Sequence, residues 1–468
     1  MQTPPEIQRH KTAVLLVTSI AAFVTPFMGA SVNIALPSMA QEFATDAITL
    51  SWIATSFILC AAVFLIPMGR IADIGGRKKV FIWGGVIFGA SSIACALAWS
   101  AEILIVARVL QGVGGAMLFG TSAAIISSVY PPGERGHAMG INIGIVYLGL
   151  SLGPFLGGLM TQYMGWRSIF WLNVLLCALL VMVTVWKLKA EWAEAQGEKF
   201  DLFGSVVYGA GLVALMYGLS ELPALPGFIS LGAGIVILLI FLKWESTIPS
   251  PILDIYLFAH NRVFAFSNLA AFINYSATFA VGFLLSLYLQ YIKGLSPSDA
   301  GIVLVAMPVV QAIFSPLTGR LSDRIQPRLL ASSGMALTAA GLLMLVFVKS
   351  DTTIWYIIIS LVVLGAGFAL FSSPNVNAVM SSVDRKALGV ASATLATMRL
   401  TGQMFSLGIA MLLISLFMGR VQVTPEVYPQ YVQSLQTAFA IFTALCIGGI
   451  FASMARGKAH RSGPQGHE

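Results

Sequence analysis

Long apolar stretches recur along almost the whole chain, and this pattern constrains the fold more than any other feature. About 20 predominantly apolar residues are enough for an α-helix to cross the hydrocarbon core of a bilayer, and Pro or Gly interruptions are tolerated there. The chain is 57% apolar and only 10% charged, whereas soluble domains carry about 25% charged residues. We therefore expect an all-α membrane protein. The expected spans number about fourteen and are 13–36, 49–68, 80–99, 103–127, 138–160, 168–186, 204–220, 228–243, 263–289, 300–317, 329–348, 355–380, 387–417 and 434–454.

Basic residues are distributed unevenly between the loops that join these spans. With the N-terminus in the cytoplasm, 20 of the 26 Lys and Arg residues fall on the cytoplasmic side and two lie within spans. The four on the outer side are Arg167, Lys293, Lys349 and Arg420. This is the positive-inside bias, so we expect both termini in the cytoplasm. The net charge of +7 then reflects topology and not a nucleic-acid partner.

The sequence offers little support for metal, cofactor or enzymatic chemistry. The five histidines show no HExxH arrangement, and no phosphate-binding GxxxxGK[ST] loop or nucleophile–base constellation is present. The cysteines lie within apolar stretches without metal-ligand spacing, at Cys60, Cys95, Cys177 and Cys446. We expect no metal, no cofactor and no catalysis. Energy for any transport would come from an ion or substrate gradient.

Two polar breaks divide the chain into six, two and six spans. The charged segment 187–201 predicts a cytoplasmic linker, for which a partly helical structure is one interpretation. The segment 243–262 contains two prolines and an amphipathic stretch that could lie at the membrane surface. The expected units are an N-terminal six-helix bundle at 1–189, the linker with two additional helices at 190–261, a C-terminal six-helix bundle at 262–455 and a polar tail at 456–468.

A Gly-Arg-x-x-Asp motif occurs at 69–73 and again at 319–323, each time after the second span of a six-span unit. The matched positions indicate an internal repeat, as in transporters built from duplicated bundles. Asp73 can pair with Arg70 or Arg77 and accept hydrogen bonds at a helix N-terminus. Such a cluster could close the cytoplasmic face and break when the bundles rock apart; the alternative is a solvated basic loop that only sets topology. The candidate gate residues are Gly69, Arg70, Asp73, Arg77, Gly319, Asp323 and Arg324.

Two arginines fall inside expected spans. A charged side chain at the centre of a membrane helix costs about 2.5–3.5 kcal/mol on insertion scales and is a functional candidate by default. Arg399 lies about twelve residues into its span, roughly 18 Å at the helical rise. Arg108 is shallower and shares a helix face with Gln111, so snorkelling or pairing with carbonyl groups is the alternative there.

The fifth span carries Gly149, Gly153 and Gly157 at four-residue intervals, with Pro154 and Gly158 beside them. The line of missing side chains permits close helix contact, and a proline within a helix favours a bend. By spacing alone, small-residue packing is the simpler interpretation.

Together, these motifs resemble those of the major facilitator superfamily. Residues 69–79 are similar to its inner-loop motif, 108–115 to its span-four motif and 149–158 to the span-five signature of its antiporters. The six-two-six layout resembles the fourteen-span drug:proton antiporter family. Further likenesses to that family are 32–37, 166–170, 201–204 and 399–402. The resemblance implies a multi-pass protein of a prokaryotic cytoplasmic membrane that exports small molecules by alternating access, with protons as the coupling ion.

One departure from the family pattern bears on coupling. That family commonly has Asp five residues before the position of Asn33, where this chain has Met28. None of the 19 acidic residues falls deep within an expected span, although an embedded carboxylate is the usual proton carrier. Candidates near a cavity mouth are Asp73, Glu221 and Glu102, and the residues alone do not decide between them.

Uncharged polar residues within spans are the candidates to line a pathway, and we expect about half of them to reach a cavity while the others only join helices. With two arginines as the only embedded charges, the midplane is neutral to positive. We expect a neutral, zwitterionic or anionic amphipathic substrate. The candidate cavity residues are Asn33, Gln111, Asn142, Asn274, Tyr275, Asn375, Asn377 and Gln403, together with Asn173 and Asn268.

Three functions remain open at this point. The favoured one is a secondary active exporter of hydrophobic or amphipathic molecules, coupled to proton antiport. The second is an uptake carrier or facilitator without antiport, which Met28 keeps open. The third, a receptor or scaffold, is disfavoured by the duplicated loops and by inner loops of at most about twenty residues. Nothing in this architecture requires more than a monomer.

Overall fold

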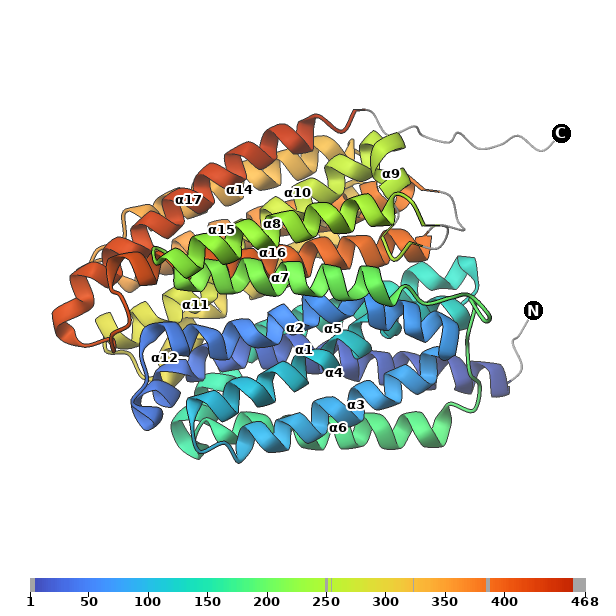
Figure 1. Ribbon diagram of the computed structural model, residues 1–468, viewed down its shortest axis with the longest axis horizontal. Helices are drawn as coiled ribbons and strands as arrows, with labels where there is room; N and C mark the ends of the chain where they lie inside the picture. The colour runs from blue at the N-terminus through green and yellow to red at the C-terminus, as the bar shows by residue number, and fades with distance from the viewer. Residues whose placement is uncertain (1–4, 249–250, 254, 323, 384–387, 458–468) are drawn as a thin grey trace.

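The computed structural model describes residues 5–248, 251–253, 255–322, 324–383 and 388–457. Within these ranges the chain forms long helices joined by short connections, and fourteen helical segments are long and apolar enough to cross a membrane. The predicted all-α membrane fold with fourteen spans is confirmed. The start of α1 and the end of α17 lie at the same end of the molecule, on the right in Figure 1. We call this end the terminal face and the other end the opposite face.

The first six spans form one bundle. α1 packs on α5 and α6, α2 packs on α4, and α3 packs on α4 and α6. The helices of this N-terminal bundle are α1 (Pro5–Phe43), α2 (Ala47–Gly75), α3 (Arg77–Ala96), α4 (Ala101–Val129), α5 (Pro132–Met164) and α6 (Arg167–Lys187).

The last six spans form a second bundle with the same order of contacts. Its first span packs on its fifth and sixth, its second on its fourth, and its third on its fourth and sixth. This repeated packing supports the internal repeat that the two loop motifs indicate. The elements of this C-terminal bundle are α10 (Arg262–Thr278) with α11 (Ala280–Leu287) and the π-helix η1 (Tyr288–Ile292), α12 (Pro297–Leu304) with α13 (Ala306–Ser322), α14 (Pro327–Val346), α15 (Ile354–Ser381), α16 (Leu388–Phe417), and α17 (Tyr428–Met454) after the short η3 (Pro425–Val427).

Two additional helices complete the fold. α7 (Leu202–Glu221) packs against α2 and α16 and so contacts both bundles, and it lies between them in Figure 1. α8 (Leu225–Glu245) packs on α7, and most of its apolar side chains remain exposed toward the membrane. Glycines permit this contact, because a Cβ added at Gly218 would lie 2.7 Å from Leu231 N. The six-residue α9 (Ile255–His260) leads from this hairpin to α10.

Short polar residues begin several of these helices by accepting hydrogen bonds from free backbone N–H groups. Asp46 accepts from Ile48 N at 2.9 Å and from Thr49 N at 3.0 Å at the start of α2. Such caps let a helix begin at a polar loop without leaving donors unpaired in the membrane interface. The other residues that cap in this way are Ser100, Asp201, Asn261 and Ser296.

The helices differ from the expected spans in two respects. Most extend past the apolar stretch, as α1 does to Phe43, because the helix continues in polar surroundings after it leaves the hydrocarbon core. The linker at 188–201 contains only one turn and no helix. The partly helical interpretation of this linker is wrong, because its backbone instead pairs with the loop between α2 and α3.

Candidate functional site

A cavity of about 1420 Å³, part of it open to solvent, lies between the two bundles. Its walls come from α1, α2, α4 and α5 on one side and from α10, α11, α12, α13, α15 and α16 on the other, and most of the lining side chains are apolar. An apolar lining with a few polar groups is typical of sites that bind small molecules. The polar or aromatic hydrogen-bonding residues in its lining include Asn33, Tyr147, Tyr275, Gln311, Arg399 and Gln403.

Arg399 is the one charged residue among the described residues that line this cavity. It is half-buried on α16, and its guanidinium carbon lies 5.3 Å from the centre of the Tyr275 ring. None of the ion pairs between described residues includes Arg399. A guanidinium that lies over an aromatic ring in an apolar cavity attracts an anionic or electron-rich group strongly, because little water is present to screen its charge.

Gln311 on α13 adds a free hydrogen-bond donor to the same cavity. The residue is 3% exposed, and its Nε2 has no hydrogen-bond partner. Across the interface, Tyr147 of α5 and Ser372 of α15 are joined by a hydrogen bond of 2.9 Å between their hydroxyl groups. Gln311 was not among the predicted cavity residues, although it is an uncharged polar residue within the expected span 300–317, like those that were.

The structure separates the other predicted cavity residues into two groups. Asn33, Tyr275 and Gln403 line the cavity, whereas the remainder lie elsewhere in the bundles. Several of these join neighbouring helices: Asn142 Nδ2 donates to Thr18 O at 3.0 Å, Asn375 Nδ2 to Ser267 O at 3.2 Å and Asn377 Nδ2 to Ser322 Oγ at 2.5 Å. Asn173 and Asn268 donate to carbonyl groups of their own helices, and Asn274 is buried with both amide atoms unpartnered.

Arg108 lies inside the N-terminal bundle and not at the cavity. It is 1% exposed, and its Nε donates to Ile53 O at 3.1 Å. Its Nη1 donates to Gln111 Oε1 at 2.5 Å, and Gln111 Nε2 donates in turn to Ser92 Oγ at 2.8 Å. The guanidinium also lies 4.5 Å from the centre of the Phe57 ring. This network holds α2, α3 and α4 together, so pairing with a carbonyl group describes Arg108 better than snorkelling does.

Contacts between the bundles concentrate in the half of the molecule near the opposite face. Ser286 Oγ donates to Asn33 O at 2.7 Å, and Gln290 Nε2 donates to Ile34 O at 3.0 Å. Among the described residues, the polar contact of this kind nearest the terminal face is that between Tyr147 and Ser372. The structure is therefore closed toward the opposite face. Further bonds that close it join Ala47 N to Val421 O, Gln422 Nε2 to Ala44 O and Ser298 N to Gln162 Oε1.

Three glycines of the span-five motif face α1 within the N-terminal bundle. A Cβ added at Gly149 would lie 2.7 Å from Phe23 O, and one added at Gly157 would lie 2.8 Å from Ser31 Cα. Ser31 Oγ also donates to Gly153 O at 2.9 Å. This part of the motif allows two helix backbones to approach closely.

The rest of the motif faces the C-terminal bundle. A Cβ added at Gly158 would contact Pro297 O, and one added at Gly301 would contact Pro154 O. Through these two contacts the start of α12 packs against α5, between the cavity and the opposite face. The motif therefore serves both packing within one bundle and closure between bundles.

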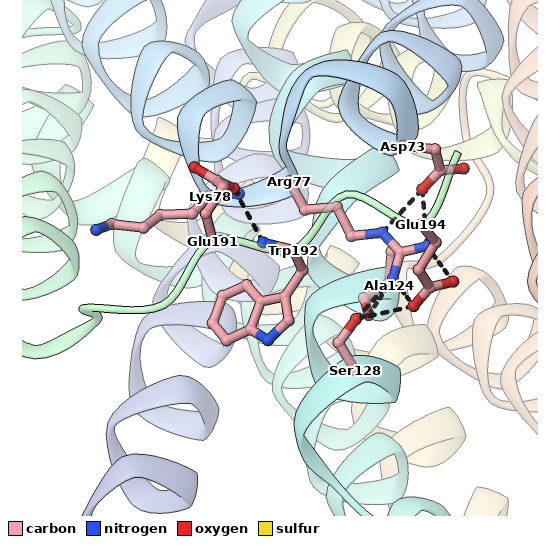
Figure 2. A network of polar contacts seen from close by, with 8 residues as sticks. All are labelled: Asp73, Arg77, Lys78, Ala124, Ser128, Glu191, Trp192 and Glu194. Carbon is pink, nitrogen blue, oxygen red and sulfur yellow. Dashed lines mark hydrogen bonds and ion pairs between the residues drawn. The ribbon is translucent and has the colours of Figure 1, made fainter. Parts of the chain in front are cut away.

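The predicted gate loop forms a cluster on the terminal face (Figure 2). Arg77 at the start of α3 pairs with Asp73 at 2.7 Å and with Glu194 of the linker at 2.6 Å. Its Nη1 also donates to Ser128 Oγ of α4 at 2.6 Å. The hydrogen bond from Arg77 is the main reason that the pKa of Glu194 is lowered from its ordinary value. The cluster ties α2, α3, α4 and the linker together within one half of the molecule.

Backbone and side-chain bonds fasten the linker along this loop. Arg77 N donates to Trp192 O at 2.8 Å, and Ala195 N donates to Asp73 O at 3.0 Å. Lys78 N donates to Glu191 Oε1 at 2.8 Å (Figure 2). Arg70 forms an ion pair with Glu198. These glutamates were not among the predicted gate residues, although an acidic segment together with a basic loop is a charge pattern that predicts pairing.

The second copy of the gate motif is described only in part. Gly319 lies near the end of α13, where an added Cβ would be 3.9 Å from Ser373 Cβ. Arg324 is exposed just after α13, and Asp323 lies outside the described residues. Within the described ranges, no group of three or more His, Cys, Asp or Glu residues could hold a metal ion.

A sequence model of the Major Facilitator Superfamily matches residues 18–245 and 268–467 of this chain. The chain belongs to the Major Facilitator Superfamily. As a Major Facilitator Superfamily transporter, it is an integral multi-pass membrane protein that acts on a small-molecule substrate.

Two relatives and one solved structure indicate its neighbours in this superfamily. The riboflavin transporter RibZ of Clostridioides difficile (strain 630) is 29% identical over 402 residues, which cover 86% of this chain and 87% of that protein. The multidrug resistance protein Stp of Mycobacterium tuberculosis (strain ATCC 25618 / H37Rv) is 30% identical over 412 residues, 87% of this chain and 76% of that protein. A crystal structure of the peptide transporter POT in complex with sulfate has the same fold, with a TM-score of 0.70, 17% identity and 96% of each chain covered.

Met28, at the position where the family resemblance implies Asp, is fully buried and does not line the cavity of this Major Facilitator Superfamily protein. Its sulfur lies 4.0 Å from Asn173 Nδ2 of α6. The position is therefore part of the packing between α1 and α6, where an ionised carboxylate would need a partner that an apolar thioether does not.

Proposed function

We propose that this protein is a secondary active exporter of amphipathic small molecules in a prokaryotic cytoplasmic membrane, driven by proton antiport. The observation that carries the proposal is the cavity between the bundles, which is largely apolar, contains Arg399 and is closed toward the opposite face. Relatives named for multidrug resistance and for riboflavin transport support a small organic substrate.

The lining indicates the class of substrate. Arg399 and the free Nε2 of Gln311 are donors, and no acidic residue lies among the described lining residues to attract a cation. Aromatic side chains such as Phe57, Tyr275 and Phe368 offer flat apolar surfaces. We therefore propose a neutral, zwitterionic or anionic amphipathic substrate whose acceptor atoms contact Arg399 and Gln311 while its apolar part contacts the rings.

On the positive-inside bias we place the terminal face in the cytoplasm, and the structure then represents the inward-facing state of the proposed cycle. Export then begins with substrate binding from the cytoplasm or inner leaflet. The bundles rock so that the contacts around Asn33 and Gly158 separate and the terminal face closes. The gate loop and its linker move as one unit with the N-terminal bundle, because Arg77 holds both Asp73 and Glu194. The working unit is a monomer.

The second candidate is a facilitator or uptake carrier without antiport. It is favoured by the lining of the cavity, because no acidic side chain that could carry a proton lies among the described lining residues. The two functions differ in whether a proton gradient drives accumulation, which makes them separable in one experiment.

The test uses inside-out vesicles that contain the protein and a panel of anionic, neutral and dicationic amphipathic compounds. An imposed pH gradient, acid inside, should drive accumulation of anionic or neutral compounds above the level without a gradient. Accumulation that only equilibrates would support the facilitator, and preferential transport of dicationic dyes would contradict the proposed substrate class.

Arg399→Gln should weaken transport of anionic compounds about ten-fold or more, because a hydrogen bond to a charged group contributes about 1.5–3 kcal/mol. Neutral compounds should be affected less. Arg420→Gln is the matched control, because Arg420 is also an arginine but lies at the opposite face in an ion pair with Glu221. Equal effects of the two substitutions would remove Arg399 from substrate binding.

A further inference from the structure

Away from the cavity, one buried carboxylate has an oxygen without a hydrogen-bond donor. Glu245, the last residue of α8, is 2% exposed, and its Oε2 accepts a hydrogen bond from Leu253 N at 2.9 Å. Its other oxygen, Oε1, is buried and has no partner. An ionised carboxylate in such surroundings is costly unless a donor or a cation compensates it. Oε1 is therefore an acceptor that a proton or a donor would stabilise.

The group that faces this oxygen is a second carboxylate. A Cβ added at Gly204 would lie 2.6 Å from Glu245 Oε1 and would also contact Asp201 Oδ2, so both oxygens lie over this glycine. Asp201 caps α7 by accepting from Gly204 N at 3.0 Å, and it accepts from Trp244 Nε1 at 3.1 Å. Asp201 thus has donors that stabilise a negative charge, and Glu245 Oε1 has none.

No described basic side chain compensates the pair. None of the ion pairs between described residues includes Asp201 or Glu245. The connector that follows α8 contributes backbone N–H groups to Glu245, and Lys243 on α8 is exposed. Asp254 lies outside the described residues. Glu245 is buried and Asp201 is partly exposed; ionisation of both carboxyl groups at such short range is opposed, because like charges repel.

We infer that Asp201 and Glu245 together bind one proton on the terminal face of the α7–α8 hairpin. The proton is taken from water and resides on Glu245, whose O–H donates to Asp201 Oδ2. This bond occupies the unpartnered Oε1, and the negative charge remains on Asp201, where Gly204 N and Trp244 Nε1 stabilise it.

The proton holds the start of α7 to the end of α8. Its loss places a second negative charge in the pair and weakens this contact. Because α7 packs against both α2 and α16, the pair is positioned to make the arrangement of the bundles sensitive to cytoplasmic pH. This consequence for transport rests on the proposed function, whereas proton binding itself does not.

Infrared difference spectroscopy of the full-length protein in lipid nanodiscs tests the proton directly. With pH raised from about 5 to about 9, above the ordinary carboxyl range, the wild type should show a protonated carboxyl band that persists at neutral pH. Glu245→Gln should remove this band, and Asp201→Asn should move its loss to lower pH. The matched control is Glu221→Gln, at the other end of α7, where the carboxylate pairs with Arg420; the band should remain.

A wild type without this band, or a band that persists in Glu245→Gln, would overturn the inference. Loss of the band on addition of Na⁺ or Ca²⁺ at fixed pH would also overturn it, because the pair would then bind a metal cation. Trp244 provides an independent readout: its fluorescence should change across the same pH range as the band, and this change should vanish in Glu245→Gln. Failure of gradient-driven transport in vesicles would overturn the exporter proposal and leave the proton site standing.

Discussion

The contact between α5 and α12 makes a quantitative prediction about the two states of the transporter. A Cβ added at Gly158 would contact Pro297 O and would lie 3.1 Å from both Pro297 C and Ser298 Cα. All three are backbone atoms, so no side-chain rotation relieves the overlap. Only separation of the two helices does so. Gly158→Ala should therefore destabilise the state that is closed at the opposite face.

Overpacking of this kind costs about 1–3 kcal/mol. Since about 1.4 kcal/mol corresponds to a ten-fold change in an equilibrium constant, the ratio of the closed to the open state at the opposite face should fall about 5- to 150-fold. Alanine also favours a helix over glycine by about 1 kcal/mol. That gain applies to both states, because α5 remains helical in each, and it cancels from the ratio.

The assay is a distance measurement between spin labels at two exposed residues on the opposite face, Trp99 in the N-terminal bundle and Phe347 in the C-terminal bundle. Gly158→Ala should increase the population with the longer distance. The matched control is Gly144→Ala on the same helix, where an added Cβ meets nothing within 4 Å. An unchanged distance distribution in folded Gly158→Ala, or the same shift in Gly144→Ala, would refute the reasoning.

Three further predictions concern the cluster on the terminal face and the embedded arginine. Asp73→Asn weakens the pair with Arg77 and should slow turnover about three- to ten-fold at equal expression; unchanged vesicle transport would remove Asp73 from the mechanism. Arg108→Met leaves Ile53 O without its donor and should lower the free energy of unfolding by about 1–3 kcal/mol, seen as a lower melting temperature, while substrate preference stays the same. The hydrogen bond from Arg77 lowers the pKa of Glu194 in the folded protein. Docking of the linker is therefore favoured above the pKa that Glu194 has in the unfolded chain, and it is lost as the pH falls through the pKa of Glu194 in the folded protein. Limited proteolysis of the linker should increase at acid pH, and Glu194→Gln should abolish this dependence.

The fold followed from the sequence because membrane insertion makes hydropathy decisive. Backbone groups within the hydrocarbon core must be paired internally, so an apolar stretch of sufficient length forms a helix. The paired motifs at 69–73 and 319–323 also indicated the duplication that the repeated helix contacts now display. Breaks within spans, such as that between α12 and α13, lie outside what hydropathy can reveal, because both segments are equally apolar.

The site could be predicted only in part, since position along a helix does not tell which neighbour a polar side chain meets. Asn33 and Asn142 are both asparagines within expected spans, yet the first lines the cavity and the second donates to a carbonyl group of α1. The two arginines show the same ambiguity: Arg399 lies at the cavity and Arg108 inside a bundle. The Asp201–Glu245 pair escaped notice because 44 positions separate its members in the chain.

The central claim is that one cavity between the bundles becomes accessible from each face in turn. It is tested most directly by the reactivity of a single cysteine in the cavity toward a membrane-impermeant thiol reagent, in vesicles of known orientation. Gly29→Cys is suited to this, because Gly29 lines the cavity and an added Cβ meets nothing within 4 Å; the native cysteines are buried and are replaced. We predict reaction from the terminal face alone, and additional reaction from the opposite face when Gly158→Ala is introduced. Two results would contradict the claim. One is no reaction from either face; the other is reaction from both faces that is the same with and without Gly158→Ala.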